Sequence, residues 1–471
     1  MAISPKRVAQ PDVVGQAGPR AVPNPAVSHL TRMIGEADPY WLGDEELLEI
    51  QRQSMAERFR ERRAQIKVLD QRASDLGIDS LESFEDVIPL LFAHQTYKSY
   101  PDAFVSGGRW DLLTRWLDTL TPRDVSGISM DGVGDVDAWV ARLGEHGHQV
   151  VVSSGTTGKA SFLYRTAEDR EVMDGNMIRG MCLTMGLTAD NTLPVFLLGP
   201  KTGNYVFVYM LQACAERFGR PGAVHWLLDE SVSEVAMQRQ AMLKKRAEDG
   251  TATPNEIREL QDGARERQEQ MRVAVAELAD VMIATRSDPS IIAGLWLPQY
   301  LMMEEFHRRG LGDGGFHPKT GMLVGGGNKG NLLPEGYEKD VARFYGLPPD
   351  RWHRMYGMVE MSSTFYYCEA GRYHRPPWVT MLVLDREGER LLNPTEGPVS
   401  GRMAFFDHAL EGRWGGLISG DRIEADFSTC PCGRRSPQIT SISRYSDLPE
   451  GDDKLSCAGT MAAYVRGVIQ E

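Results

Sequence analysis

The sequence predicts an α/β protein with a large, mainly parallel sheet flanked by helices, a smaller β-rich subdomain and a short C-terminal tail. From Val151 onward, short apolar segments alternate with helical segments, as they do in βαβ units. After about Pro376 the apolar runs become short and are bounded by glycine, which is typical of a β-rich subdomain. A chain of 471 residues is also too long for one small core and suits two or three subdomains.

The composition excludes several classes of protein. Contents of 42% hydrophobic and 25% charged residues are ordinary for a globular protein. The net charge of −13 argues against a general nucleic-acid binder, which would present a basic face. No apolar run approaches the roughly 20 residues that span a bilayer. Six cysteines in so long a chain do not make a disulfide scaffold, so we expect a cytoplasmic protein.

We expect five regions along the chain. Residues 1–38 are rich in Ala, Pro and Val and lack the apolar core of a signal peptide, so they predict a disordered arm. The regions that follow are a helical region over 39–148, an α/β region over 149–375, a β-rich subdomain over 376–445 and a C-terminal tail over 446–471.

The helical region shows loosely helical spacing of apolar residues from Pro39 to about Arg72, and a second helical zone from Ser83 to Phe92. The segment 94–101 is aromatic and polar, and a proline ends it. Such a segment could line a pocket or could close a pair of helices, and we favour the structural role.

The α/β region begins with a strand over 149–153 and a helix over 167–185. Apolar runs over 193–198 and 205–211 indicate buried strands, or a strand followed by a helix. The later elements that we expect are strands over 224–228, 281–284 and 323–328, a helix over 291–307, and short β-runs over 379–384, 401–406 and 416–418.

Residues 233 to about 284 predict a long helical hairpin. Its second helix begins with Thr253-Pro254-Asn255-Glu256. This order places a hydroxyl at the N-cap, proline at the first helical position and glutamate three residues on, which is a capping box. Both helices are strongly charged, and we expect their charges to form a solvated face.

A polar loop follows the first strand of the α/β region. Its seven residues contain four hydroxyls, two glycines and a lysine, namely Ser153, Ser154, Gly155, Thr156, Thr157, Gly158 and Lys159. Glycine lets the backbone approach a ligand closely, and hydroxyls, free N–H groups and a lysine together bind anions. The loop therefore predicts a polyphosphate site, although a polar surface turn between strands is the alternative. It is not a Walker A loop, because only two residues separate its glycines and Ala160 follows the lysine.

The string Ser-Ser-Gly-Thr-Thr-Gly-Lys resembles the phosphate loop of acyl-adenylate-forming enzymes. Four further stretches occur in the order that this family requires: Gly325-Gly326-Gly327-Asn328-Lys329, Tyr356-Gly357-Met358-Val359-Glu360, Ser419-Gly420-Asp421 and Ser443-Arg444-Tyr445-Ser446-Asp447. The resemblance implies that the glycines bind the adenine edge and that the ring of Tyr356 packs beside adenine. It also implies that Glu360 holds Mg²⁺, that Asp421 binds the ribose hydroxyls and that Arg444 contacts ribose or phosphate.

A narrower resemblance, over roughly residues 95–460, is to the bacterial acyl-protein synthetases, with the phenylacetate–coenzyme A ligases as close cousins. The stretches that carry it are Gly-Gly-Gly-x-Lys, Tyr-Gly-Met-x-Glu, the run from Cys368 to Pro377, and Cys430-Pro431-Cys432-Gly433-Arg434. It implies that ATP and Mg²⁺ convert a carboxylic acid substrate into acyl-AMP with release of pyrophosphate. A nucleophile, such as an acceptor protein, coenzyme A or an amine, then takes the acyl group. A third hypothesis is that the chain is a non-catalytic partner protein with this fold.

The end of the chain departs from the full-length ligases of this superfamily, which carry a mobile domain with an adenylation lysine after the hinge. Only 27 residues follow Arg444, so we expect a vestigial mobile domain. Lys159, Lys329 and Lys454 are the candidates for the adenylation lysine. Cys457 lies where acyl-protein synthetases carry an acyl-accepting cysteine. Lys454 would favour its thiolate, whereas Asp452 and Asp453 would raise its pKa, and a buried structural cysteine is the alternative.

Cys368, His374, Cys430 and Cys432 form a second cluster. Cys-x₅-His and Cys-x-Cys supply three sulfurs and one nitrogen, the donor set of a closed structural zinc site. In a cytoplasmic chain a metal is a better explanation than a disulfide, provided that the two pairs meet in space. His353 lies close before the tyrosine motif, and we expect it to be a core histidine.

Overall fold

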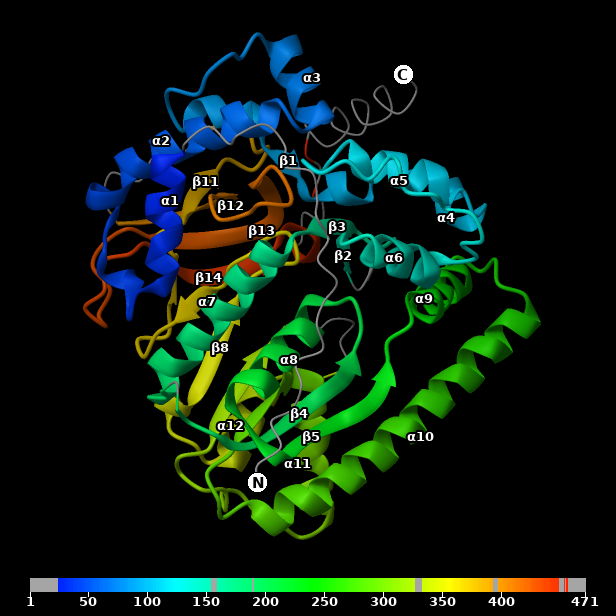
Figure 1. Cartoon of the computed structure of the whole chain (residues 1–471). Helices are drawn as coiled ribbons and strands as arrows, with labels where there is room; N and C mark the ends of the chain where they lie inside the picture. The colour runs from blue at the N-terminus through cyan, green and yellow to red at the C-terminus, as the bar shows by residue number, and fades with distance from the viewer. Residues whose placement is uncertain are drawn as a thin grey trace, which may run out of the picture.

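A computed structural model describes residues 24–153, 159–188, 190–326, 333–392 and 397–448, together with 453 and 455. Figure 1 shows the chain with the parallel strands in its lower half, the antiparallel strands at the upper left and short helices along the top. The expected disordered arm is wrong in part, because α1 (Pro25–Arg32) and η1 (Met33–Gly35) lie within it. The carboxylate of Glu57 accepts the N–H groups of Ala26 and Val27, which fixes the start of α1.

Five parallel strands form one half of the sheet, in the order β5-β4-β6-β7-β8. Their bounds are β4 (Leu193–Thr202), β5 (Gly219–Ser231), β6 (Ile291–Leu295), β7 (Gly321–Gly325) and β8 (Trp352–Tyr356). On β4, Val195 and Leu197 belong to the apolar cluster of α7 (Ala167–Met185) and α8 (Val206–Phe218). Its alternate residues Phe196 and Leu198 pack toward α10 (Pro254–Thr285), α11 (Trp296–Arg308) and α12 (Tyr337–Tyr345). Helices therefore cover both faces, as the sequence predicts.

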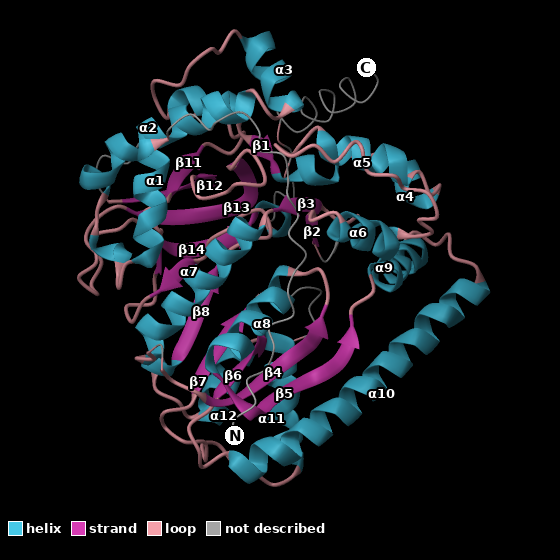
Figure 2. Ribbon diagram, in the orientation of Figure 1, coloured by secondary structure: helices cyan, strands magenta, loops and turns pink. Residues whose placement is uncertain are grey.

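The antiparallel half continues the same hydrogen-bonded sheet from β8, in the order β9-β10-β14-β13-β12-β11. Its strands are β9 (Phe365–Tyr367), β10 (Tyr373–His374), β11 (Val379–Leu384), β12 (Pro398–Asp407), β13 (Gly416–Asp426) and β14 (Gln438–Arg444). The short β1 (Phe92–Ala93) adds to β13 in parallel. The expected β-rich region is therefore continuous with the parallel strands, and Figure 2 shows both halves in magenta.

Short helices pack on the antiparallel half and beside the hairpin of β2 (Gln149–Val152) and β3 (Phe162–Arg165). The α-helices are α2 (Asp44–Arg63), α3 (Lys67–Leu76), α4 (Asp102–Ser106), α5 (Trp110–Asp118) and α6 (Val136–Glu145). The 3₁₀ helices in this part of the structure are η2 (Pro39–Trp41), η3 (Glu85–Leu90), η4 (His94–Lys98) and η6 (Tyr445–Asp447), whereas η5 (Pro349–Arg351) precedes β8 and contacts α7.

The helical hairpin is confirmed as α9 (Glu234–Glu248) and α10, which runs along the lower right of Figure 1. Thr253 and Glu256 form the predicted capping box. Two later predictions are wrong. Residues 281–284 are the end of α10, whose apolar side chains pack on the sheet, and 291–295 form β6 before α11 begins at Trp296. Within the described residues, no helix is both long and apolar enough to cross a membrane.

His353 on β8 is a core residue, as predicted. Its ring is buried against α7, where Nδ1 lies 3.1 Å from Oγ1 of Thr184. Burial lowers the pKa of His353 to about 3, so the imidazole is neutral. The ring occupies the space above Gly180, since a β-carbon on that glycine would lie 2.4 Å from Cε1 of His353.

We predict that Gly180→Ala destabilises the protein, because the added methyl overpacks a core that the histidine ring already fills. The expected cost is roughly 1–3 kcal/mol. Gly175→Ala in the same helix is the matched control, because its nearest neighbour would be 4.0 Å away. Helix propensity makes that variant neutral or more stable. Thermal unfolding of both variants checks the prediction, and equal stability of the two would contradict it.

Candidate active site

The site is built at the carboxyl ends of the parallel strands, where ligands bind in open α/β sheets. β7 ends at Gly325 and β8 ends at Tyr356, and the two strands are paired through Val324 and Arg354. Gly326 follows with a φ of 75°, a left-handed conformation that favours glycine. Gly327 and Lys329, predicted to continue this turn, lie outside the described residues.

Three of the predicted motifs meet at the carboxylate of Asp421. The hydroxyl of Tyr356 donates a hydrogen bond to Oδ2 of Asp421 at 2.7 Å, and Nε of Arg444 lies 3.8 Å from Oδ1. Asp421 and Arg444 are direct partners in the pairing of β13 with β14. Burial and the neighbouring carboxylate raise the pKa of Tyr356 well above its usual value, so the phenol stays protonated and remains a donor.

The Ser-Gly-Asp motif has a local structural reason. Oγ of Ser419 accepts the N–H of Asp421 at 3.1 Å and donates to the carbonyl of Met403 at 2.8 Å, which orients this part of β13 against β12. A β-carbon at Gly420 would lie 2.7 Å from Oδ2 of Asp453. Glycine therefore allows Asp453 to approach this strand closely.

Two buried arginines hold the turn that carries Glu360. Nη2 of Arg165 donates to the carbonyls of Val359 and Met361 at 2.8 and 2.6 Å. Arg413 donates to the carbonyl of Glu360 at 2.9 Å and also to the carbonyl of Tyr164. Both guanidinium groups therefore tie this turn to β3, the strand that follows the polar loop. Sequence reasoning missed them, because Arg165 is the last residue of β3 and Arg413 lies between β12 and β13, where a charged residue is ordinary.

The polar loop joins β2 to β3, which is an antiparallel hairpin. At its base, Ser153 N–H donates to the carbonyl of Ser161 at 3.1 Å, and Oγ of Ser153 accepts the N–H of Ser161 at 2.8 Å. Ser154, Gly155, Thr156, Thr157 and Gly158 lie outside the described residues. The predicted strand before the loop is confirmed, and the phosphate role stays a prediction.

Lys159 contacts residues at the start of α4 and just before it. Its ammonium lies 2.7 Å from Oδ1 of Asp102 and 4.3 Å from the centre of the Tyr100 ring, and it donates to the carbonyl of Tyr100. A phosphate bound at the loop would compete with Asp102 for this charge. The predicted Lys454 and Cys457 lie outside the described residues, as do Asp452 and Lys329.

The segment 94–100 does more than connect helices. Nε2 of His94 lies 3.2 Å from Oδ2 of Asp453, and the Arg413 guanidinium lies 5.5 Å from the ring centre of Tyr97. The hydroxyl of Tyr100 donates to the carbonyl of Ala160 at 2.8 Å. The segment therefore contacts Ala160 just after the polar loop, Arg413, which holds the Glu360 turn, and Asp453. The structural role that we favoured did not predict these contacts.

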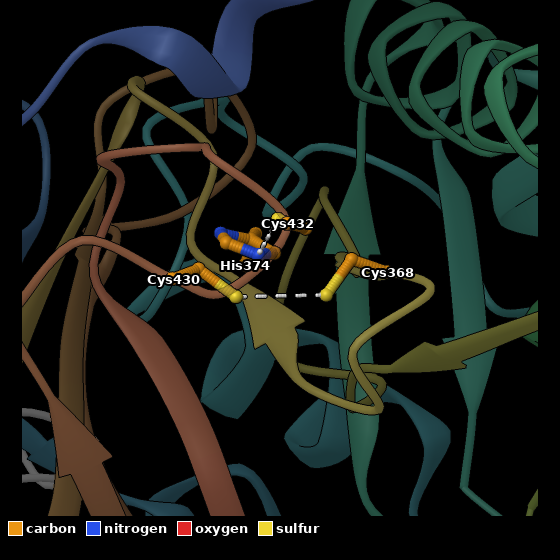
Figure 3. A group of neighbouring side chains, drawn as sticks. All are labelled: Cys368, His374, Cys430 and Cys432. Atoms are coloured by element: carbon orange, nitrogen blue, oxygen red, sulfur yellow. Dashed lines mark hydrogen bonds between the residues drawn. The ribbon is translucent and has the colours of Figure 1, made fainter.

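A second cluster brings Cys368, His374, Cys430 and Cys432 together, and their ligand atoms all lie within 4.8 Å of one another (Figure 3). The sulfurs of Cys368 and Cys430 are 3.8 Å apart, and Sγ of Cys432 is 3.4 Å from Nε2 of His374. Zinc bonds of about 2.3 Å to sulfur and 2.0–2.1 Å to nitrogen place tetrahedral ligands about 3.5–3.8 Å apart. The geometry therefore fits a zinc ion.

The two loops that carry these cysteines have the same type of turn. In each, the cysteine N–H donates to the carbonyl four residues on at 2.9 Å, and a glycine with positive φ, Gly371 or Gly433, closes the turn. Nδ1 of His374 lies 2.8 Å from Oγ of Ser436, which orients Nε2 toward the sulfurs. Burial lowers the pKa of His374 to about 4, which leaves the neutral imidazole that a metal requires.

No family model and no curated protein matches this chain. Among solved structures it is similar to 2-hydroxyisobutyryl-CoA ligase in the postadenylation state in complex with R3-HIB-AMP, at 13% identity and a TM-score of 0.52. The complex of that ligase with 2-HIB-AMP gives 13% identity and 0.51. Both matches cover 87% of this chain and 70% of the other. These likenesses show the fold: the chain has the adenylate-forming ligase fold.

Proposed function

We propose that this chain is an enzyme that activates a carboxylic acid with ATP and then transfers the acyl group to a thiol. In the first step a carboxylate oxygen attacks the α-phosphorus and forms acyl-AMP. The bond between this phosphorus and the bridging oxygen breaks, and pyrophosphate leaves with the electron pair. In the second step a thiolate attacks the acyl carbonyl and AMP leaves. The observation that carries the proposal is the meeting of Tyr356, Asp421 and Arg444 at the carboxyl ends of the parallel strands.

Each predicted residue has a role in this reaction. The polar loop with Lys159 binds the phosphates, and Gly325 to Gly327 contact adenine. Tyr356 packs beside the base, and Asp421 accepts hydrogen bonds from the ribose hydroxyls. Gly357 lets the chain after Tyr356 pack closely on Thr364, since a β-carbon there would lie 2.9 Å from Cγ2 of Thr364. Arg444 contacts ribose or phosphate. Glu360 holds Mg²⁺, which prefers carboxylate and phosphate oxygens and, when bound, neutralises phosphate charge.

The acceptor is the finer part of the proposal. As the first acyl acceptor we propose Cys457 of this same chain, from which the acyl group would pass to an acceptor protein or to coenzyme A. A coenzyme A ligase, or a ligase for an amine, is the alternative. The ligase that shares the fold is named for coenzyme A and was solved with an acyl-AMP, which supports both the adenylation and the thiol.

We also propose that Cys368, His374, Cys430 and Cys432 hold one structural zinc. The site has four protein ligands and no open position, which is typical of a structural role. Because the cysteines follow β9 and β13 while His374 lies on β10, the ion would fasten the β9–β10 hairpin to the β13–β14 connection.

The adenylation step is tested by exchange of labelled pyrophosphate into ATP across a panel of carboxylic acids. We expect Lys159→Ala and Glu360→Gln each to lower exchange by a factor on the order of 100, because preorganised charge acts on the transition state. Glu259→Gln, on the exposed face of α10, is the control and should exchange normally. Wild-type rates in both site variants would refute the ATP site, and no exchange with any acid would favour a non-catalytic role.

Elemental analysis tests the zinc site. We expect one zinc per chain in the purified protein, and we expect Cys430→Ser to lose the ion together with thermal stability, because metal binding and folding are coupled. Cys182→Ser, which changes a cysteine outside the cluster, should keep the zinc. A folded protein without zinc, whose three cluster cysteines react with a thiol reagent, would contradict the proposal.

Intact-protein mass spectrometry after incubation with ATP and the cognate acid tests Cys457. We expect the mass to increase by one acyl group, because a thioester divides one difficult transfer into two easier ones. Cys457→Ser should prevent the increase while pyrophosphate exchange continues. An unchanged wild-type mass with consumption of coenzyme A would favour the ligase alternative, and unchanged labelling of Cys457→Ser would move the nucleophile elsewhere.

A further inference from the structure

His94 and Asp453 form a pair of imidazole and carboxylate beside the Ser-Gly-Asp motif, and the reaction proposed above gives a role to neither. Nε2 of His94 lies 3.2 Å from Oδ2 of Asp453. A β-carbon at Gly420 would lie 3.2 Å from Cε1 of His94 and 2.7 Å from Oδ2 of Asp453. Both side chains therefore pack directly against the backbone of Gly420, the residue before Asp421.

The sheet itself holds the imidazole in this place. β1 pairs in parallel with β13 through Phe92 with Leu417 and Ala93 with Ile418. His94 begins η4 directly after β1. Because the strand before His94 lies beside the strand that carries the Ser-Gly-Asp motif, the backbone of His94 is fixed next to that motif.

Asp453 orients the ring of His94. Oδ1 of Asp453 accepts a hydrogen bond from Nη1 of the buried Arg402 at 2.7 Å, and the same Nη1 donates to the carbonyl of Ser419 at 3.0 Å. Although burial opposes it, hydrogen bonds from His94 and Arg402 hold the pKa of Asp453 below its usual value, so this group is a carboxylate. A carboxylate only accepts hydrogen bonds, so in the neutral imidazole Nε2 carries the proton and Nδ1 carries the free lone pair.

That free nitrogen is buried. Nδ1 of His94 has no hydrogen-bond partner in the part of the chain that the structure describes. A buried acceptor without a partner is unfavourable, because it has lost its water and gained no other donor. A substrate group that gives a proton to Nδ1 would remove this cost. A histidine with one nitrogen on a carboxylate and the other free for a proton has the arrangement of a general base in acyl transfer.

The acyl-accepting thiol of the proposed function is a proton donor of this kind. Leu455 is buried in the same apolar cluster as Ile418, the β13 partner of Ala93. Cys457 follows Leu455 by two residues, and two residues span at most about 7 Å. The length of chain therefore allows this thiol to approach η4. Coenzyme A would bring the same chemical group from solution.

We propose that His94 is the general base of the second step, which takes the proton of the acyl-accepting thiol, and that Asp453 is its positioning residue. This inference rests on the proposed function. Nδ1 accepts the thiol proton while the sulfur attacks the acyl carbonyl carbon. The bond from that carbon to the phosphate oxygen breaks, AMP leaves with the electron pair, and the imidazolium then gives its proton to solvent. The first step uses a carboxylate as the nucleophile and needs no such base.

The test compares His94→Gln and Asp453→Asn with His307→Gln, which changes a similar pair on the surface. Nε2 of His307 lies 3.4 Å from Oδ1 of Asp313, and both of these side chains are exposed. Pyrophosphate exchange reports the first step. Single-turnover transfer from acyl-AMP formed on the full-length enzyme reports the second step. The intact mass of the protein measures transfer to Cys457, and formation of acyl-coenzyme A measures transfer to a free thiol, so the two sources of the thiol are distinguished.

We expect His94→Gln to slow transfer on the order of 100-fold and to lower exchange by no more than about threefold, because general-base catalysis contributes roughly 10²–10⁴-fold. Asp453→Asn should slow transfer by about tenfold or more, because an amide can hold the ring in the wrong tautomer. His307→Gln should perform both steps at the wild-type rates. Transfer to 4-nitrothiophenol, a thiol that is already ionised at neutral pH, should lose much less in His94→Gln than transfer to coenzyme A.

Transfer by His94→Gln within about threefold of wild type would overturn the inference and leave the proposed function intact. Equal losses of exchange and transfer, or equal losses with both thiols, would also overturn it, because they indicate a structural role. If thermal unfolding shows that His94→Gln does not fold, wild-type transfer by Asp453→Asn would overturn the inference, and slowed transfer with normal exchange would support it. A wild-type protein that exchanges pyrophosphate with no acid would instead show that the proposed function is wrong.

Discussion

The hydrogen bond from Tyr356 to Asp421 joins the two halves of the sheet at the point where the candidate site lies. Tyr356 ends the last parallel strand, whereas Asp421 and Arg444 face each other on antiparallel strands that are reached only through β9 and β10. A carboxylate that accepts a phenol hydrogen bond beside a guanidinium is held in one orientation. The other residues of the site, from the turn that carries Glu360 to Asp453, are arranged around this hydrogen bond.

Three buried arginines also join separate segments around the site. Arg165, Arg402 and Arg413 are almost fully buried, and each donates to backbone carbonyls of a neighbouring segment. A buried charge is costly unless its donors are used, so these arginines favour one arrangement of the segments that they join. Arg402 also pairs with Asp453 and lies 4.1 Å from the ring centre of Tyr445, which keeps Asp453 beside the Ser-Gly-Asp motif. The cysteine–histidine cluster would restrain β10 and the connection from β13 to β14.

Much of the fold could be predicted from local patterns. Alternation of apolar runs and helices predicts the parallel sheet, and Thr253 with Glu256 predicts the start of α10. Residues 281–284 could not be assigned, because a short apolar run is compatible with a strand and with a buried helix end. Strand pairings between segments that are far apart in the sequence could not be predicted either. β1 lies beside the Ser-Gly-Asp motif only because it pairs with β13, some 325 residues later, and nothing local in the sequence indicates that pairing. The cysteine and histidine spacing, in contrast, predicted a donor set that the fold does bring together.

The central claim is that the Asp421 junction is where the nucleotide binds. A crystal structure with Mg·ATP tests it most directly. The account predicts that the ribose hydroxyls lie within hydrogen-bond distance of the Asp421 carboxylate, between Tyr356 and Arg444, with the triphosphate directed toward Lys159. A nucleotide bound elsewhere, with the bond between Tyr356 and Asp421 undisturbed and Lys159 still on Asp102, would contradict it.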